Sequence, residues 1–116
     1  MAEAVEGVTS VEVVVIEEAD GTCGLWELPA AWSENGTEED RRAAVPLLRE
    51  AVVNLGRRAF VDVHVLVRGP RGAGTPEAVP PHQVEAAVAD MERWFGPDES
   101  TGLVTLTLTD AGAWFL

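Results

Sequence analysis

Hydrophobic and polar positions follow two different periods along this chain. Residues 11–28 hold two apolar runs on either side of Asp20-Gly21, a favoured pair for a two-residue hairpin loop. We therefore predict a β-hairpin over about residues 11–28. Clear period-two alternation recurs in residues 61–68 and 103–109, which we predict to be strands that pair with each other.

The stretch between Thr37 and Gly56 predicts the first of two main helices. Thr37 with Asp40 resembles a capping box, and Gly56 is a typical stop. Pro46 would cost about 3 kcal/mol inside a helix, so we expect a break there. Either the regular helix begins near Val45, or a short helix meets a longer one at this point. Apolar residues follow at helical spacing: Val45, Leu48, Val52 and Leu55.

A second helical pattern follows a loop rich in glycine and proline. It covers residues 82–95, and the chain closes with a short helical turn capped by Thr109. The 116 residues suit a single domain with its own core. In chain order the elements are strand, strand, helix, strand, helix, strand. We expect an α+β fold: a small, mostly antiparallel sheet with two main helices.

The chain has a formal net charge of −12, and its charged residues are distributed unevenly along the sequence. Residues 1–40 carry eleven acids and no arginine, whereas residues 41–71 carry seven of the eight arginines and only two acids. The overall charge opposes non-specific attraction to DNA or to an anionic membrane. No apolar run is long enough for a membrane span, and the N-terminus lacks a signal-peptide pattern. We expect a cytoplasmic protein.

On a helical wheel, three of these arginines share one side opposite the apolar stripe, so we expect them to face solvent or a partner. They are Arg42, Arg49 and Arg57; Arg58, Arg68 and Arg71 extend the basic stretch. Three interpretations remain open. The arginines pair with acids of the same chain, contact DNA phosphates, or bind an acidic protein partner.

Two segments resemble the second half of a winged helix-turn-helix. "VPLLREAVVNLGRRAFVDVHV" is similar to a helix that ends at a glycine-arginine turn and enters the first wing strand, and "VTLTLTDAG" is similar to a closing strand. The resemblance is to small winged-helix-like proteins of actinobacteria and covers about residues 37–116. It implies a winged-helix-like second half and the DNA-binding alternative. The chain departs from that pattern in two ways: about 35 residues replace the usual wing loop, and the predicted hairpin replaces the N-terminal helix.

Candidate chemistry is sparse. Cys23, Asp62 and His64 supply the residue types of a nucleophilic site, but nothing in the sequence brings Cys23 near the other two. One cysteine and two histidines do not provide a usual transition-metal site, and no glycine-rich loop carries a P-loop lysine. We predict no catalytic residues, no metal and no cofactor.

Tryptophans provide the remaining candidates for an interface. Trp32 falls in a predicted loop, and Trp114 with Phe115 belongs to the apolar C-terminal tail. If these side chains are exposed, they would anchor an interface. If Trp114 and Phe115 are buried, they would instead dock the tail on the domain. We predict a small acidic, non-enzymatic protein-interaction or regulatory module that binds a protein partner or itself as a homodimer through a sheet edge or the tail. A winged-helix DNA-binding regulator is the alternative.

Overall fold

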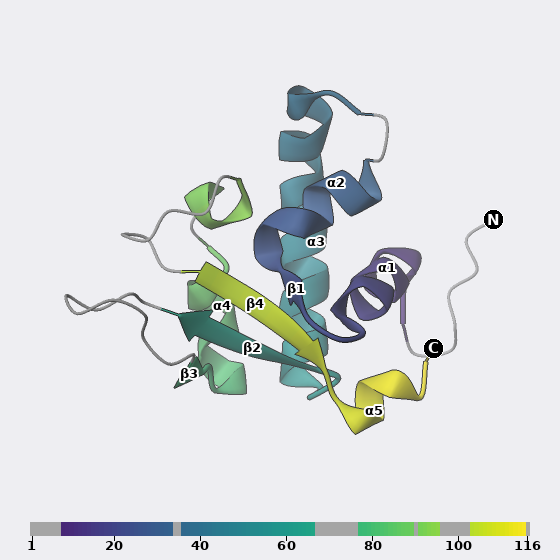
Figure 1. Ribbon diagram of the computed structural model, residues 1–116, viewed down its shortest axis with the longest axis vertical. Helices are drawn as coiled ribbons and strands as arrows, with labels where there is room; N and C mark the ends of the chain where they lie inside the picture. The colour runs from purple at the N-terminus through teal and green to yellow at the C-terminus, as the bar shows by residue number, and fades with distance from the viewer. Residues whose placement is uncertain (1–7, 34–35, 67–76, 90, 96–102, 116) are drawn as a thin grey trace.

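The computed structural model describes residues 8–33, 36–66, 77–89, 91–95 and 103–115. It is an α+β fold in which a four-stranded antiparallel sheet packs against several helices (Figure 1). The strand order is β1-β4-β2-β3. The strands are β1 Cys23–Gly24, β2 Val61–Leu66, β3 Glu77–Ala78 and β4 Leu103–Leu108.

The two predicted long strands are confirmed, and so is their pairing. β2 and β4 run antiparallel with Val61 opposite Leu108 and Leu66 opposite Leu103. β1 pairs with the other edge of β4, where Cys23 lies opposite Leu106. Because side chains alternate across a strand, one face of this sheet is apolar and turned towards the helices. Its buried members include Val61, Val63, Val104 and Leu106.

The predicted hairpin over residues 11–28 is wrong, because its first half is helix α1 (Ser10–Ala19). Thr9 and Glu12 form a capping box: the Glu12 amide donates to the Thr9 hydroxyl, and the Thr9 amide donates to Glu12 Oε1 over 2.7 Å. The β-branched run favours a strand by propensity, but burial of one side of the helix overrides that preference. The buried residues recur at i, i+3, i+4 and i+7: Glu12, Val15, Ile16 and Ala19. The chain turns after α1 through Gly21, whose φ is +95°.

Helix α3 (Glu38–Arg57) is continuous, so the predicted break at Pro46 is wrong. The predicted capping box is confirmed, since the Asp40 amide donates to the Thr37 hydroxyl over 3.2 Å. Pro46 and Arg42 are both exposed. The Arg42 carbonyl that loses its donor at Pro46 can therefore be hydrated, which lowers the cost of the proline.

The end of α3 is a Schellman motif in which alanine takes the usual place of glycine. The Ala59 amide donates to the Gly56 carbonyl and the Phe60 amide to the Leu55 carbonyl, over 3.1 and 2.9 Å. Ala59 has a φ of +61°, a region that costs residues with a Cβ atom about 1 kcal/mol. This turn leads directly into β2.

The predicted second main helix over residues 82–95 is replaced by three short pieces. These are the 3₁₀ turn η2 (Pro81–Gln83), helix α4 (Val84–Ala87) and the 3₁₀ turn η3 (Met91–Trp94). Val84, Val88 and Trp94 are fully or almost fully buried and fix these pieces to the domain. We call residues 81–89 and 91–95 the covering segment, because η2 and α4 contact one side of α3.

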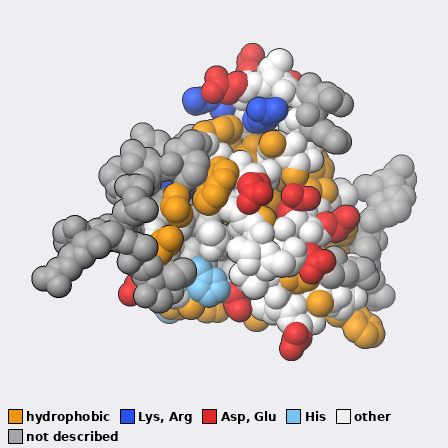
Figure 2. All heavy atoms as spheres, in the orientation of Figure 1, with side chains coloured by type: hydrophobic (Ala, Val, Ile, Leu, Met, Phe, Trp, Pro, Cys, Tyr) orange, Lys and Arg blue, Asp and Glu red, His pale blue; other side chains and the backbone are white. Residues whose placement is uncertain are grey.

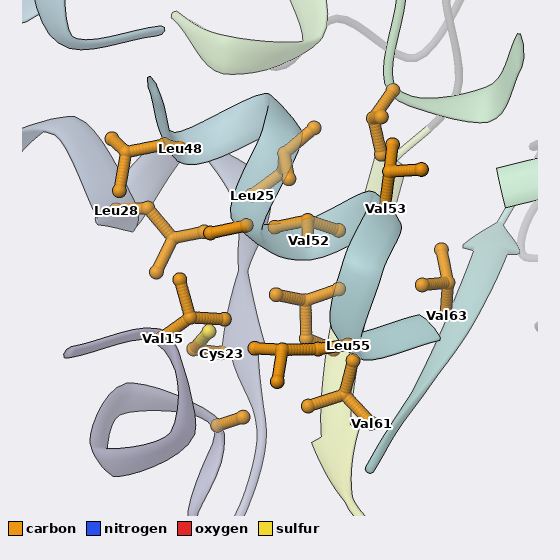
Figure 3. Close-up of a cluster of buried hydrophobic side chains, with 14 of the residues drawn as sticks. Val15, Cys23, Leu25, Leu28, Leu48, Val52, Val53, Leu55, Val61 and Val63 are labelled. Atoms are coloured by element: carbon orange, nitrogen blue, oxygen red, sulfur yellow. The ribbon is translucent and has the colours of Figure 1, made fainter. Parts of the chain in front are cut away.

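The core lies between α3, the sheet, and the short elements before α3. Those elements are η1 (Leu25–Glu27) and α2 (Leu28–Trp32). Figure 3 shows buried side chains from α1, β1, η1, α2, α3 and β2 meeting in this cluster, among them Val15, Leu25, Leu28, Leu48 and Val52. Helix α5 (Asp110–Ala113) follows β4, and its predicted cap is confirmed by the Gly112 amide donating to the Thr109 hydroxyl over 3.1 Å.

Candidate interaction surfaces

Three sides of α3 have different neighbours. The apolar side packs in the core, α1 and α2 contact α3 on one flank, and α4 contacts it on the other (Figure 1). At 100° per residue, Arg42, Arg49 and Arg57 share the flank of the covering segment. Ala43 and Leu47 share the flank of α1 and α2, and Glu50 lies between the two flanks and lines a hollow on each. These two flanks are the candidate surfaces.

Arg49 lies against the end of α4. Its Nε donates to the Val88 carbonyl over 3.3 Å, and the indole Nε1 of the buried Trp94 donates to the same carbonyl over 2.9 Å. One residue earlier, Arg93 donates to the Ala87 carbonyl over 2.8 Å. Carbonyls at a helix C-terminus lack intrahelical donors. The two guanidinium groups and the indole therefore supply hydrogen-bond donors to the carbonyls at the end of α4.

Arg42 and Arg57 contact the same covering segment. Arg57 forms an ion pair with Glu85 over 3.4 Å, with both side chains more than half exposed. The Arg42 guanidinium lies 5.4 Å from the centre of the Phe95 ring, within cation–π range. All three arginines of the predicted stripe therefore have contacts within the chain. A hollow of about 520 Å³ between α3 and the covering segment is lined by Pro46, Arg49, Glu50, Val53, Asn54, Arg57, Glu85 and Ala89.

Of the other predicted arginines, Arg58 alone belongs to the described residues. Arg58 is at the C-cap of α3, and its guanidinium lies 4.4 Å from the Phe60 ring centre. Arg68 and Arg71 fall outside the described residues. Figure 2 shows acidic side chains spread across the visible face, whereas arginines are seen mainly near the start of α3.

Arg41 was not among the predicted site residues. Its spacing to Ala44, Val45 and Leu48 places it on the core side of α3, and its Nε atom is buried. Within the part of the chain that the structure describes, this Nε has no hydrogen-bond partner. The one arginine that enters the apolar side of α3 thus lies away from the stripe.

The opposite flank of α3 carries exposed apolar side chains. Leu47 is 50% exposed and Trp32, at the end of α2, is 36% exposed. They line a hollow of about 520 Å³ together with Ser33, Gly36, Asp40, Ala43 and Ala44. Leu47 also lines a smaller hollow of about 180 Å³ with Thr9, Val11, Glu12, Glu50, Ala51 and Asn54. We call these two adjoining hollows the Leu47 groove.

Sequence reasoning named Trp32 but did not select Leu47 as a surface residue. The available signal was its place on the wheel between Asp40 and Asn54, two polar residues that are each seven positions away. In the C-terminal tail, Phe115 packs on Phe60 with ring centres 4.9 Å apart, whereas Trp114 is 83% exposed. The tail therefore docks through Phe115 and presents Trp114 to solvent.

Cys23, Asp62 and His64 do not form a nucleophilic site. Cys23 lies opposite Leu106, which lies opposite Val63, so the thiol belongs to the buried face of the sheet. Asp62 and His64 alternate with Val63 and point to the other face. Burial, followed by the nearby Glu27 and Glu18, raises the pKa of the Cys23 thiol to about 12, so the thiolate is not available at neutral pH.

The described residues contain no group of three His, Cys, Asp or Glu side chains placed to hold a metal ion. Across the same residues, no helix has both the length and the apolar character that a bilayer span requires. Comparison of the chain with protein-family models, with curated proteins and with solved structures finds no match in any of the three.

Proposed function

We propose that this chain is a small acidic protein-interaction module that binds a partner through the Leu47 groove and has no enzymatic activity of its own. The observation that carries the proposal is the contrast between the two flanks of α3. Arg42, Arg49 and Arg57 have contacts with the covering segment, whereas Leu47 is half exposed between two hollows. An aromatic and an aliphatic side chain beside a concave surface are typical anchors of an interface.

Site-specific photo-crosslinking in the organism that produces the protein tests this proposal. A photoreactive amino acid at Leu47 should give adducts with another protein, and the same amino acid at exposed Gln83 in the covering segment should not. Because Leu47 is half exposed, replacing it should leave folding intact. Adducts at neither position, or equal adducts at both, would contradict the proposal.

Self-association is a second form of the same function. It would use Trp114, the most exposed large hydrophobic side chain among those described, or an edge of the sheet. As described, the edge strands β1 and β3 have two residues each, which offers few backbone groups for pairing. Light scattering at micromolar concentration distinguishes the forms: a particle near 12.4 kDa would exclude a stable homodimer.

A winged-helix DNA-binding regulator is the second candidate, and the order of elements favours it. With α1 in place of the predicted hairpin, one of the two departures from the winged-helix pattern is removed. The remaining order places α2 and α3 in succession before β2, with β4 between β1 and β2 in the sheet. In a helix-turn-helix, the second of two such helices enters the major groove.

The covering segment weighs against DNA binding through α3. The second departure, the insertion between the two wing strands, includes this segment, and it lies on the flank that carries the arginines. The formal net charge of −12 would also repel phosphates. A gel shift at low and moderate salt tests this candidate. A shift at low salt that weakens when Arg57 is replaced by Gln would support it, and no shift at low salt would exclude it.

A further inference from the structure

The charges around the Leu47 groove indicate what chemistry its partner must have. This inference rests on the proposed function, because it names the kind of partner that the same surface would take. The side chains that line the two hollows include Asp40, Glu50 and Glu12, and among the described residues no Lys or Arg lines either of them. The groove is therefore apolar at Trp32 and Leu47 and acidic along α3.

The acids hold different positions in the groove. Glu50 is exposed and one helical turn beyond Leu47, so its carboxylate can reach a partner that covers Leu47. One oxygen of Asp40 accepts the Thr37 amide over 3.0 Å, which places that carboxylate at the start of α3. Glu12 is buried, with Oε1 held by the Thr9 amide, and adds negative charge beneath the smaller hollow. A partner that covers Leu47 thus meets carboxylates on both sides along α3.

A second copy of the chain fits this groove poorly. In an isologous dimer each copy presents the same patch, so Asp40 and Glu50 of one copy would face carboxylates of the other. Like charges brought together across an interface are destabilising, and a net charge of −12 on each copy adds long-range repulsion. The same charge excludes an acidic peptide or a nucleic acid from this flank.

We propose that the Leu47 groove binds an amphipathic helical segment of a basic partner protein. Apolar side chains on one side of that segment would cover Leu47 and Trp32. Lys or Arg side chains beside them would reach Glu50 and Asp40. The i, i+4 and i+7 spacing of Ala43, Leu47 and Glu50 gives the groove a strip along α3, which is the kind of surface on which another helix lies.

Three synthetic helical peptides of about 18 residues test the inference. All three share one apolar stripe. The first carries Lys at all positions outside the stripe, the second carries Gln there, and the third carries Glu. Fluorescence anisotropy of the labelled peptides, titrated with the full chain, should show that the Lys peptide binds more tightly than the Gln peptide and that the Glu peptide does not bind. Binding of the Lys peptide should weaken as salt rises from about 50 to about 300 mM.

Variants locate the site. Leu47→Asn should weaken binding of the Lys peptide at least about ten-fold, because it removes a central apolar anchor without adding a charge. Glu50→Gln should weaken it by about two- to five-fold, and Asp62→Asn should leave it unchanged. Asp62 is exposed on β2 and provides the matched control, since it loses the same charge away from the groove. Circular dichroism and tryptophan emission establish that each variant is folded.

Several outcomes would overturn the inference. Equal binding of the Lys and Gln peptides would refute the charge argument, and binding unaffected by Leu47→Asn would refute the site. Self-association lost in Leu47→Asn would make a second copy the occupant. If no peptide binds but crosslinking at Leu47 in cells gives adducts, this inference fails and the proposed function stands. If neither peptides nor adducts are found, both fail.

Discussion

Replacing Arg49 by Met tests whether the arginine stripe is part of the folded structure. Met keeps most of the length and apolar volume of the arginine stem but removes the guanidinium. The bond lost is the one from Nε to the Val88 carbonyl, at 3.3 Å, from a half-buried side chain. Hydrogen bonds to charged groups contribute about 1.5–3 kcal/mol to stability. Because this bond is long and partly exposed, we expect it to contribute about 1.5 kcal/mol or less.

The Val88 carbonyl keeps a second donor in this variant. Trp94 Nε1 still donates to it over 2.9 Å, so no buried acceptor is left without a partner. We therefore expect Arg49→Met to lower the free energy of unfolding by about 1 kcal/mol. Arg57→Met removes only an exposed ion pair and should cost about 0–0.5 kcal/mol. It serves as the matched control because it removes the same group from the same flank of α3.

Urea unfolding followed by tryptophan fluorescence measures both variants. With a slope of about 2 kcal/mol per molar urea, Arg49→Met should shift the midpoint down by about 0.5 M, and Arg57→Met by less than half of that. If Arg49→Met is as stable as the parent protein or more stable, the guanidinium does not contribute to the stability of the fold. The reasoning on the covered flank would then be refuted.

Three further predictions concern the core and its edges. Trp94→Ala should cost about 3–5 kcal/mol in urea unfolding, whereas Trp114→Ala should change stability by less than about 0.5 kcal/mol. Ala59→Gly should raise the free energy of unfolding by about 0.5–1 kcal/mol, because glycine adopts positive φ without a Cβ penalty; an unchanged midpoint would contradict this. Iodoacetamide should modify Cys23 slowly in the native protein at pH 8 and rapidly in urea. The folded protein holds the thiol proton up to a pKa of about 12, whereas the unfolded chain releases it near pH 9. Ionisation of Cys23 should therefore lower stability as pH rises from about 9 to about 12.

The sheet could be predicted from the sequence where its pattern was strict. The alternation in residues 61–68 and 103–109 identified β2 and β4 and their pairing, because one face of each strand is buried. The caps at Thr37 and Thr109 were also readable, since each side chain accepts an amide three residues on. These are local features that the chain determines within a few residues.

Helix α1 could not be read from propensity. Its valines favour a strand, and Asp20-Gly21 strengthens the hairpin interpretation. The contrary signal was the capping box of Thr9 and Glu12, which satisfies two amides at the helix start. The continuous helix through Pro46 was missed for a related reason: the cost of a proline depends on whether its surroundings are exposed, which a sequence does not state.

The candidate site was predictable only in part. The wheel placed Arg42, Arg49 and Arg57 together on the side away from the apolar stripe, and the structure keeps them there. No pattern could indicate that Arg49 meets a carbonyl 39 residues later, because this contact depends on the packing of Trp94 and Val88. The exposure of Leu47 likewise depends on where α1 and α2 pack against α3.

Labelling of introduced cysteines most directly tests the claim that the covering segment shields Val53 on one flank of α3 while Leu47 on the other flank is open. Val53 lies under the covering segment at 6% exposure, Leu47 is 50% exposed, and native Cys23 is buried, so single variants can be followed without background. Maleimide should label Leu47→Cys at least about ten times faster than Val53→Cys under native conditions. Equal labelling rates in folded variants would show that the covering segment does not close this flank and would contradict the account.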